Sequence, residues 1–259
     1  MHPFPVPLLF LKIKQETEER KMKVELGKIG SVRQGVVLNR VKGKNGEPEE
    51  NYPLLTIGRL LQEEEGAFTE EQATVSVAES KKSSLKLAKE GMILIGLTSF
   101  HRAVVLTKEK EGMVIPSNFL ILEFPGGIMD AHYFAWYFNE SPEMESLKES
   151  IIHGEGKVKV LSIQQIRSIK IEVPDLVTQM AVGNLYSLQL KKSRIWRQIL
   201  RLEMQNLTVR MGRVCEPVQM DNTDERGTET TVTLKKLYTE LRMIEDKMNI
   251  YEKELELFL

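Results

Sequence analysis

Apolar residues recur at alternating intervals of three and four residues in the last third of the chain. This spacing predicts long helices that each bury one face, as in a coiled coil. The first run lies in residues 175–207 and is interrupted by Lys192, whereas the second, in residues 232–259, is unbroken. A polar linker, residues 208–231, separates them. We expect these residues at the helix interface: Leu185, Leu188, Ile195, Ile199, Leu202, Leu234, Leu237, Leu241, Ile244, Met248, Tyr251 and Leu255.

The two predicted helices carry opposite net charge. Residues 175–213 hold 7 Lys and Arg against 2 Asp and Glu, whereas residues 214–259 hold 6 against 11. Pairing the basic helix with the acidic one is therefore favoured over pairing either with a copy of itself. The linker can span an antiparallel hairpin within one chain, and pairing across a homodimer is equally compatible with the pattern. Packing of each helix on the globular part of its own chain is the third interpretation.

Residues 22–174 alternate short apolar runs with polar, glycine-containing breaks, which predicts a β-rich domain. The fold class is therefore α+β, with this domain followed by the long helices. Strands are expected at residues 31–38, 53–61, 91–97, 102–107, 119–124 and 168–173. A helix is expected at residues 130–141, where four aromatics recur at helical spacing: Tyr133, Phe134, Tyr137 and Phe138. We interpret these aromatics as core residues, and stacking on nucleic-acid bases is the alternative.

The pattern changes three times between Val160 and Val182. Ser162 followed by Gln165 fits a capping box, which predicts one turn of helix. Apolar and polar residues then alternate over residues 169–173, as in a half-buried strand. Pro174 cannot donate a backbone hydrogen bond, so the strand should end there and the first long helix should begin directly after it.

The N-terminal segment, residues 1–21, is predicted to be an arm outside the folded domain. Its apolar stretch PFPVPLLFL holds three prolines and is followed at once by charged residues, which is unlike a signal peptide or a membrane span. Met22 could serve as an alternative start. The single cysteine, Cys215, excludes an internal disulfide and fits a reducing cytoplasm.

The sequence contains no recognisable catalytic or metal-binding motif. It lacks the phosphate loop G-x-x-x-x-G-K-[ST], the H-E-x-x-H pair and any paired cysteines, and its four histidines are far apart. We therefore expect a protein that is not an enzyme and that needs no cofactor or metal. An enzyme with an unrecognised site is the weakest alternative.

Residues 171–179, IEVPDLVTQ, follow the capped turn and lead into the first long helix. This arrangement resembles the exit of a target recognition domain in the specificity subunits of type I restriction-modification systems. Five further segments resemble the same family, in the same order along the chain: LGKIGSVRQG, GMILIGLTSFHRAVVL, VIPSNFLILEF, DAHYFAWYFNES and SIIHGEGKVKVLSIQQIRSIK. The resemblance covers about residues 22–207. Met92 departs from it, because the family commonly has Asp at that position.

The resemblance implies a specificity subunit of half length, since typical members carry two recognition domains and this chain has room for one. The expected function is to read one half of a two-part DNA target and to recruit the subunits that methylate adenine. A homodimer would then supply two recognition domains on a helical spacer. The implied partners are double-stranded DNA, adenine methyltransferase subunits and, where one is present, a restriction or translocase subunit. A protein-interaction module, such as a decoy or regulator of a defence complex, is the alternative function.

Recognition of DNA requires cations or donors at phosphates and polar planar side chains at base edges. Loops of the β-rich domain are the expected place for them, and acidic segments at residues 47–50, 63–65 and 70–71 are expected to lie away from these loops. The domain has 19 Lys and Arg against 21 Asp and Glu, so its own affinity for DNA should be modest. The candidate DNA-binding residues are Arg40, Lys42, Lys44, Asn45, Lys81, Lys82, Ser84, Ser99, His101, Arg102, Lys157 and Lys159.

Overall fold

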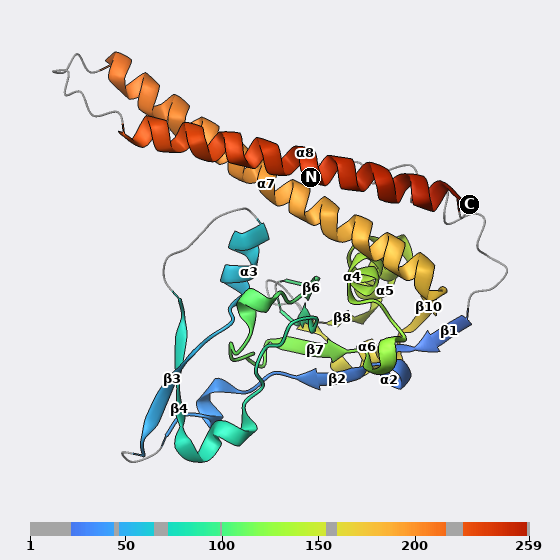
Figure 1. Ribbon diagram of the computed structural model, residues 1–259. Helices are drawn as coiled ribbons and strands as arrows, with labels where there is room; N and C mark the ends of the chain where they lie inside the picture. The colour runs from blue at the N-terminus through green and yellow to red at the C-terminus, as the bar shows by residue number, and fades with distance from the viewer. Residues whose placement is uncertain are drawn as a thin grey trace.

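The computed structural model describes residues 22–43, 47–64, 72–98, 100–153, 160–215 and 225–257. A head, residues 22–174, carries the strands, and an arm of two long helices runs along one side of it (Figure 1). The fold is α+β, as the sequence predicts. In the described part of the chain, no helix is long and apolar enough to cross a membrane.

A four-stranded antiparallel sheet forms the centre of the head. Its strands are β2 (Ser31–Gln34), β5 (Ile93–Gly96), β6 (Ala103–Val105) and β7 (Phe119–Glu123), in the order β2-β7-β5-β6. Every residue of β5 is buried, as are the first four of β7. A strand covered on both faces reads as a continuous apolar run, which explains why ILIG and FLILE show no alternation.

Three two-stranded antiparallel sheets surround this centre. They are β1 (Met22–Glu25) with β10 (Lys170–Val173), β3 (Glu49–Pro53) with β4 (Thr74–Ala78), and β8 (Ile152–His153) with β9 (Val160–Leu161). The first pair joins the start of the described chain to the strand that leads into the arm, with Met22 opposite Val173. Lys23 adds an ion pair of 2.9 Å to Glu143 in the head.

Short helices fill the remaining surface of the head. The α-helices are α2 (Leu26–Ile29), α3 (Ile57–Glu64), α4 (Ala131–Glu140), α5 (Pro142–Ile151) and α6 (Ile163–Ser168). The 3-10 helices are η2 (Leu38–Arg40), η3 (Glu79–Ser84), η4 (Lys108–Lys110) and η5 (Pro125–Gly127).

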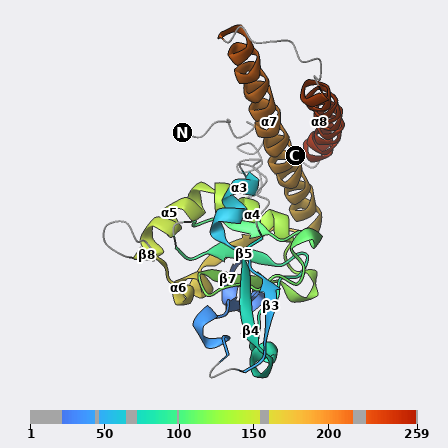
Figure 2. The same cartoon turned by 90° about the vertical axis from the view of Figure 1, so that its left-hand side faces the viewer.

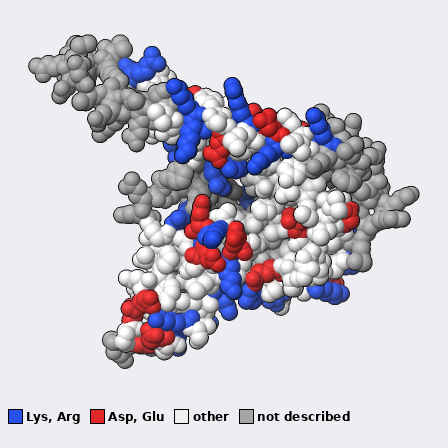
Figure 3. All heavy atoms as spheres, viewed as in Figure 1, with Lys and Arg blue, Asp and Glu red and all other residues white. Residues whose placement is uncertain are grey.

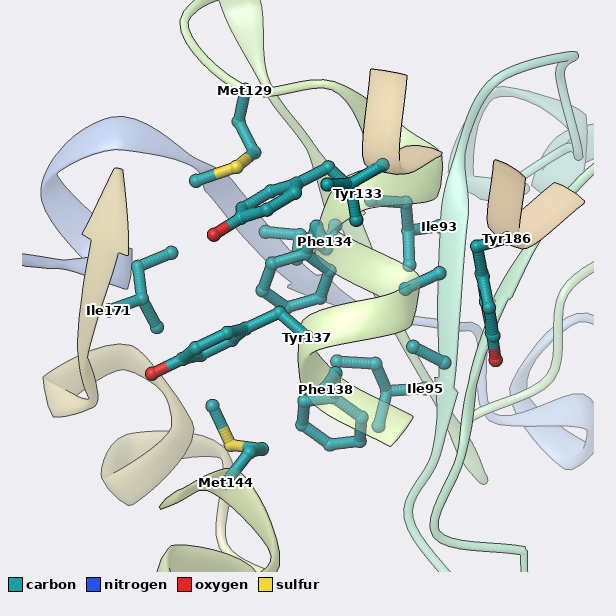
Figure 4. Close-up of a cluster of buried hydrophobic side chains, with 14 of the residues drawn as sticks. Ile93, Ile95, Met129, Tyr133, Phe134, Tyr137, Phe138, Met144, Ile171 and Tyr186 are labelled. Atoms are coloured by element: carbon teal, nitrogen blue, oxygen red, sulfur yellow. The ribbon is translucent and has the colours of Figure 1, made fainter. Parts of the chain in front are cut away.

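Helix α4 forms the aromatic core between the central sheet and the arm (Figure 4). Asp130 caps its first turn by accepting a hydrogen bond of 2.8 Å from the backbone N–H of Tyr133. The predicted core role of the four aromatics is confirmed, since each of them is buried: Tyr133, Phe134, Tyr137 and Phe138. Stacking on bases is therefore excluded for these side chains in this conformation.

Two sequence predictions for the head are wrong in detail. The strand expected at residues 53–61 is instead the end of β3 followed by α3, which Thr56 begins by accepting a hydrogen bond of 3.1 Å from the N–H of Arg59. The strand expected at residues 31–38 ends at Gln34. Gly35 follows there because a Cβ atom would lie 2.1 Å from the carbonyl oxygen of Pro116.

The arm consists of α7 (Leu176–Cys215, 40 residues) and α8 (Glu225–Leu257, 33 residues), which lie side by side and run in opposite directions (Figure 1). Both helices extend into the predicted linker, of which residues 216–224 lie outside the described chain. The extension reflects the good helix propensity of residues such as Arg210 and Met211. Apolar residues of α7 and α8 belong to the same buried cluster as β5 and α4, so one core runs from the head into the arm.

Candidate DNA-recognition head and its joint with the arm

Gln179 joins the first turn of α7 to the entrance of α4. Its side chain is 1% exposed. The amide oxygen accepts a hydrogen bond of 2.8 Å from the N–H of Asp130, and the amide nitrogen donates to the carbonyl oxygens of Pro174 at 2.8 Å and Ile128 at 3.2 Å. A buried amide that is bonded at both ends fixes its neighbours in direction as well as distance. This glutamine is the last residue of the IEVPDLVTQ segment.

One turn further along α7, Gly183 allows α7 to approach α4 closely. A Cβ atom at this position would lie 2.2 Å from the Oδ1 of Asp130 and 2.8 Å from the backbone nitrogen of Tyr133. Real Cβ atoms do not occur at such distances, so only glycine permits this spacing. The Asp130 cap and the close packing of α7 therefore depend on each other.

Tyr186 completes the joint at the other end of α4. Its hydroxyl accepts a hydrogen bond of 3.0 Å from the Nδ2 of Asn139. The same Asn139 side chain accepts from the N–H of Ala103 and donates to its carbonyl oxygen, each at 2.8 Å. These two hydrogen bonds take the place of those that a neighbouring strand would form with the edge strand β6. Residues 179, 183 and 186 lie on one face of α7 and secure it to the head at three successive points.

The predicted order of elements before the arm is present. Ser162 caps α6 by accepting from the N–H of Gln165 at 3.5 Å, and the buried Ile171 lies in β10. Asp175 then caps α7 by accepting from the N–H of Thr178 at 3.0 Å and from its hydroxyl at 2.7 Å. The Thr178 hydroxyl is the largest cause that lowers the pKa of the Asp175 carboxyl below its usual value. This residue therefore stays ionised at a helix N-terminus, where negative charge is stabilising.

The arm pairs within the chain. Buried residues on the facing sides of the two helices include Leu185, Ile195, Ile199, Leu241, Ile244 and Met248. Four other predicted interface residues pack partly buried against this core: Leu188, Leu234, Leu237 and Tyr251. Leu202 is half-buried, and the side chain of Leu255 lies outside the described part.

Charged and aromatic contacts cross between α7 and α8 beside this apolar seam. Lys191 pairs with Glu240 and Lys192 with Glu245, each at 2.9 Å. The lysine that interrupts the first apolar run therefore reaches an acid of the opposite helix. Further out, Trp196 meets Tyr238 edge to face, with ring centroids 6.4 Å apart. The basic helix α7 and the acidic helix α8 therefore form their ion pairs with each other, within one chain.

The structure brings part of the candidate DNA-binding set together at one end of the head. Arg40 and Lys42 flank Val41, whose carbonyl oxygen accepts a hydrogen bond of 2.9 Å from the N–H of Ala78. Strand β4 ends at Ala78 and continues into η3, which carries three more candidates: Lys81, Lys82 and Ser84. Four of these five side chains are exposed, and Lys82 is half-buried.

The acidic segment 47–50 lies beside these candidates, so the expectation that it lies away from them is wrong. Glu50 forms an ion pair of 2.8 Å with Lys82, which Glu79 contacts at 2.7 Å. The hydrogen bond to Glu50 is the largest cause that raises the pKa of Lys82 above its usual value, and the hydrogen bond to Glu79 is the next. Glu49 accepts a hydrogen bond from Gly43 and Glu47 accepts one from Ser80. Blue and red side chains accordingly alternate at this end of the molecule (Figure 3).

His101 and Arg102 lie elsewhere, at the start of β6 beside α4. Arg102 donates to the Oε1 of Glu140 at 3.1 Å, and its side chain is 35% exposed. This arginine therefore helps to hold β6 against the end of α4, although part of its side chain stays at the surface. The remaining candidates lie outside the described residues: Lys44, Asn45, Ser99, Lys157 and Lys159.

Sequence reasoning missed four residues that secure the joint: Gln179, Gly183, Asn139 and Tyr186. Only Gln179 could have been found from the sequence, because it is the last residue of IEVPDLVTQ, the segment that resembles the specificity subunits. No group of three or more His, Cys, Asp or Glu within the described ranges could hold a metal ion.

No protein-family model matches the chain, and no curated protein matches it in sequence. Solved structures do match. The S subunit of a type I restriction-modification system from M. genitalium aligns over 74% of this chain and 45% of its own, with 9% identity and a TM-score of 0.47. This chain is similar to type I restriction-modification S subunits.

Two further solved structures match the chain. The HsdS subunit from Thermoanaerobacter tengcongensis covers 86% of this chain and 53% of its own, with 11% identity and a TM-score of 0.47. A structure described as the basis of complex assembly and conformational transition of the type I R-M system covers 96% and 50%, with 9% identity and a TM-score of 0.44. The chain thus spans about half the length of the three chains that it matches.

Proposed function

We propose that this chain is the DNA-specificity subunit of a type I restriction-modification complex. In this role the head reads one half of a two-part target, and the arm holds methyltransferase subunits in a fixed position relative to it. The chain itself performs no chemistry. Methylation of adenine, and any cleavage, belongs to the partner subunits.

The observation that carries the proposal is the joint between α4 of the head and α7 of the arm. A specificity subunit must convert base recognition at one place into methylation at another, which requires a fixed angle between the reading head and the helices that hold the partner. Gln179 supplies that rigidity with hydrogen bonds to the N–H of Asp130 and the carbonyl oxygen of Ile128 at the entrance of α4, and Gly183 does so by close packing against Asp130. One hydrophobic core continues across the same boundary.

A single head reads a single half-site, so two copies are needed for a two-part target. A dimer with two-fold symmetry would place two identical heads at a fixed separation and would favour a palindromic target. Because α7 and α8 already pair with each other, the dimer would join two complete hairpins rather than exchange single helices.

The charge of the head supports a role within a larger complex. Residues 22–174 have a slight excess of acid, and Lys82 at the candidate surface is paired with carboxylates. Binding to phosphates requires a surplus of cations and weakens with salt. We therefore expect tight DNA binding only after methyltransferase subunits surround the duplex with their own basic residues.

Reconstitution tests this function directly. The chain would be co-expressed with an adenine methyltransferase subunit of a type I system from the same organism, and modified adenines in the host DNA would be mapped by sequencing. A single recurring two-part motif should appear only when both subunits are present. Replacement of three exposed cations, Arg40→Ala with Lys42→Ala and Lys81→Ala, should reduce methylation of that motif, whereas Lys235→Ala with Lys236→Ala on α8 should not. Unchanged methylation in the absence of this chain would refute the proposal.

A protein-interaction module is the second candidate, and the acidic segment beside the candidate loops favours it. A decoy or regulator would bind the methyltransferase subunit without needing DNA. It would therefore co-purify with that subunit while the mixture fails to shift any DNA sequence, and adding it to an active complex would lower methylation.

A further inference from the structure

Strands β3 and β4 form a two-stranded ribbon whose two faces differ in character. On one face, Val75 and Val77 are buried, with exposed fractions of 6% and 0%. Successive side chains of a strand point to opposite faces, so Asn51, Thr74 and Ser76 lie on the other face, where Asn51 is directly opposite Ser76. Asn51 and Thr74 are exposed, and Ser76 is half-buried. The outer face of the ribbon is therefore polar and uncharged at these three positions.

A ribbon of this size fits the major groove of a DNA duplex. Neighbouring strands lie about 4.8 Å apart, and the major groove is about 12 Å wide. Two-stranded ribbons bind in this groove in other DNA-binding proteins. β3 and β4 lie at an edge of the head in Figure 1 and face the viewer in Figure 2, so a duplex can approach them from outside. The ribbon can therefore bring its polar side chains to the edges of bases.

A hydrogen bond fixes the orientation of the Asn51 amide on this outer face. The hydroxyl of Ser76 donates to the Oδ1 of Asn51 at 2.7 Å. An amide oxygen has a second lone pair, and an amide nitrogen carries two donor hydrogens. An asparagine held in this way can form the bidentate pair with adenine, in which the oxygen accepts from N6 and the nitrogen donates to N7. The cross-strand bond thus orders a planar amide at the exposed surface before DNA binds.

Three exposed cations lie beside one end of the ribbon: Arg40, Lys42 and Lys81. They are held there because the N–H of Ala78, at the end of β4, donates to the carbonyl oxygen of Val41 at 2.9 Å. The Asn51–Ser76 pair is two residues away from Ala78, which is about 7 Å along the strand. Recognition of DNA combines cations at phosphates with polar side chains at base edges. Both kinds of group are present here, which favours a duplex over a protein partner.

The acidic residues at this end of the ribbon have partners within the head. Glu50 is paired with Lys82 at 2.8 Å, which offsets its negative charge. Glu49 accepts a hydrogen bond from the backbone N–H of Gly43. Because these carboxylates are engaged, their repulsion of nearby phosphates is reduced.

We propose that the β3–β4 ribbon enters the major groove of DNA and that Asn51 reads one adenine of the half-site, other than the adenine that is methylated. Ser76 is a positioning residue that orients the Asn51 amide. This inference rests on the proposed function and adds to it the side chain that chooses a base.

The methylation motif of the complex tests this assignment. The full chain would be co-expressed with the methyltransferase subunit, and the motif would be mapped for the unaltered chain, Asn51→Ala and Asn249→Ala. Asn249 is the matched control, because it is an exposed asparagine on α8. Asn51→Ala should reduce the preference for adenine at one position of the half-site by about tenfold or more, and should leave the other positions as they are. Ser76→Ala should relax the same position, and Asn249→Ala should relax none.

The outcomes separate this inference from the proposed function. A motif that is identical for the unaltered chain and Asn51→Ala would overturn the inference and leave the function standing. The absence of any motif with the unaltered chain would refute the function itself. Relaxation by Ser76→Ala at a different position from Asn51→Ala would also overturn the inference.

Competition between duplexes gives a second measurement that needs no methylation. The complex would bind a labelled duplex that carries the motif, in competition with duplexes changed at the position assigned to Asn51. Asn51→Asp keeps the shape of the side chain and its bond from Ser76, but it replaces the donor with an acceptor, so the preference should shift from adenine toward cytosine. Lys81→Ala should instead weaken binding to all duplexes alike and reduce the salt dependence by about one phosphate contact. Retention of the adenine preference by both Asn51→Ala and Asn51→Asp would disprove base reading by this residue.

Discussion

The side-chain oxygen of Gln179 accepts a hydrogen bond of 2.8 Å from the backbone N–H of Asp130. Asp130 in turn caps α4, and its own carboxylate leaves room for no side chain at Gly183. The helix that builds the aromatic core of the head is therefore positioned by the helix that builds the arm. A change at this contact should affect both parts at once.

Replacement of Gln179→Ala should destabilise the protein by about 2–4 kcal/mol, because it leaves a buried N–H and two carbonyl groups without their partner. Chemical denaturation followed by circular dichroism would measure the loss. Gln205→Ala is the matched control, since Gln205 is exposed on the same helix and should change the free energy of unfolding by less than about 0.5 kcal/mol. Equal effects of the two replacements would show that the Gln179 network is not structurally important.

Gly183→Ala should cost about 1–3 kcal/mol despite the better helix propensity of alanine, because the added methyl group forces α7 away from Asp130. Gly58→Ala in α3 is the comparison. There the nearest atom to an added Cβ is the Thr56 hydroxyl oxygen at 4.0 Å, so the change should be neutral or stabilising. A thermal melt of both variants would distinguish close approach from a general effect of glycine replacement.

The double replacement Leu241→Asp with Ile244→Asp should separate α8 from α7. Both side chains are nearly inaccessible, at 4% and 3%, and burying two carboxylates without cationic partners costs more than about 4 kcal/mol. We expect a large loss of helicity in circular dichroism. Met243→Asp, on the exposed outer face of the same helix, should leave helicity unchanged. Preserved helicity in the double variant would disprove the hairpin.

Stability should fall with mild acid through His132. Burial is the main cause that lowers the pKa of this imidazole below its usual value, partly opposed by the charge of Asp130. Below about pH 6.5 the unfolded chain therefore binds the proton more readily than the folded one, so the free energy of unfolding decreases as the pH falls through this window.

His132→Asn should remove this contribution. The difference in melting temperature between about pH 7 and pH 5 should become smaller in the variant, whereas above about pH 7.5 the two proteins should differ by a constant amount. An unchanged pH dependence would show that other groups control the acid sensitivity.

Local patterns predicted well those elements whose neighbours in sequence decide the structure. The capped turn at Ser162 and the aromatic helix after Asp130 each begin with a side chain that accepts a hydrogen bond three residues on. The strand before Pro174 was legible from its alternating pattern, although its partner β1 is distant in sequence. The two long helices followed from the same logic, since a heptad pattern is legible without knowledge of the partner. The start of α7 after Pro174 was also predicted, but the ends of the two helices at the linker were not, because they extend beyond the regular apolar spacing.

Short apolar runs were less informative. The segment 53–61 contains enough Leu and Ile for a strand, yet Leu55 and Leu60 are buried on either side of the Thr56 cap and most of the segment is helical. The hairpin of β3 and β4 was missed because β3 is polar and largely exposed. Nothing in a segment of five residues distinguishes these outcomes, since packing against distant residues decides between them.

The candidate site also combines features that the sequence predicted with features that only the structure shows. Sequence composition identified basic loops but could not show that residues 47–50 fold back onto them, because the contact between Glu50 and Lys82 spans the entire β3–β4 segment. The carboxylate of Glu140 likewise reaches Arg102 only after α4 packs on β6. Charge pairs of this kind depend on three-dimensional distance, to which spacing along the chain is no guide.

The amino-acid sequence alone determined that a β-rich part precedes two amphipathic helices of opposite charge, and where the boundary between them lies. Periodicity and capping are local properties, and they survive without tertiary contacts. Tertiary structure alone decided that the helices pair within the chain and that Gln179 and Gly183 hold α7 against α4. These features arise from close packing between segments that are distant in sequence, where a single Cβ atom or buried amide decides how near two elements can lie.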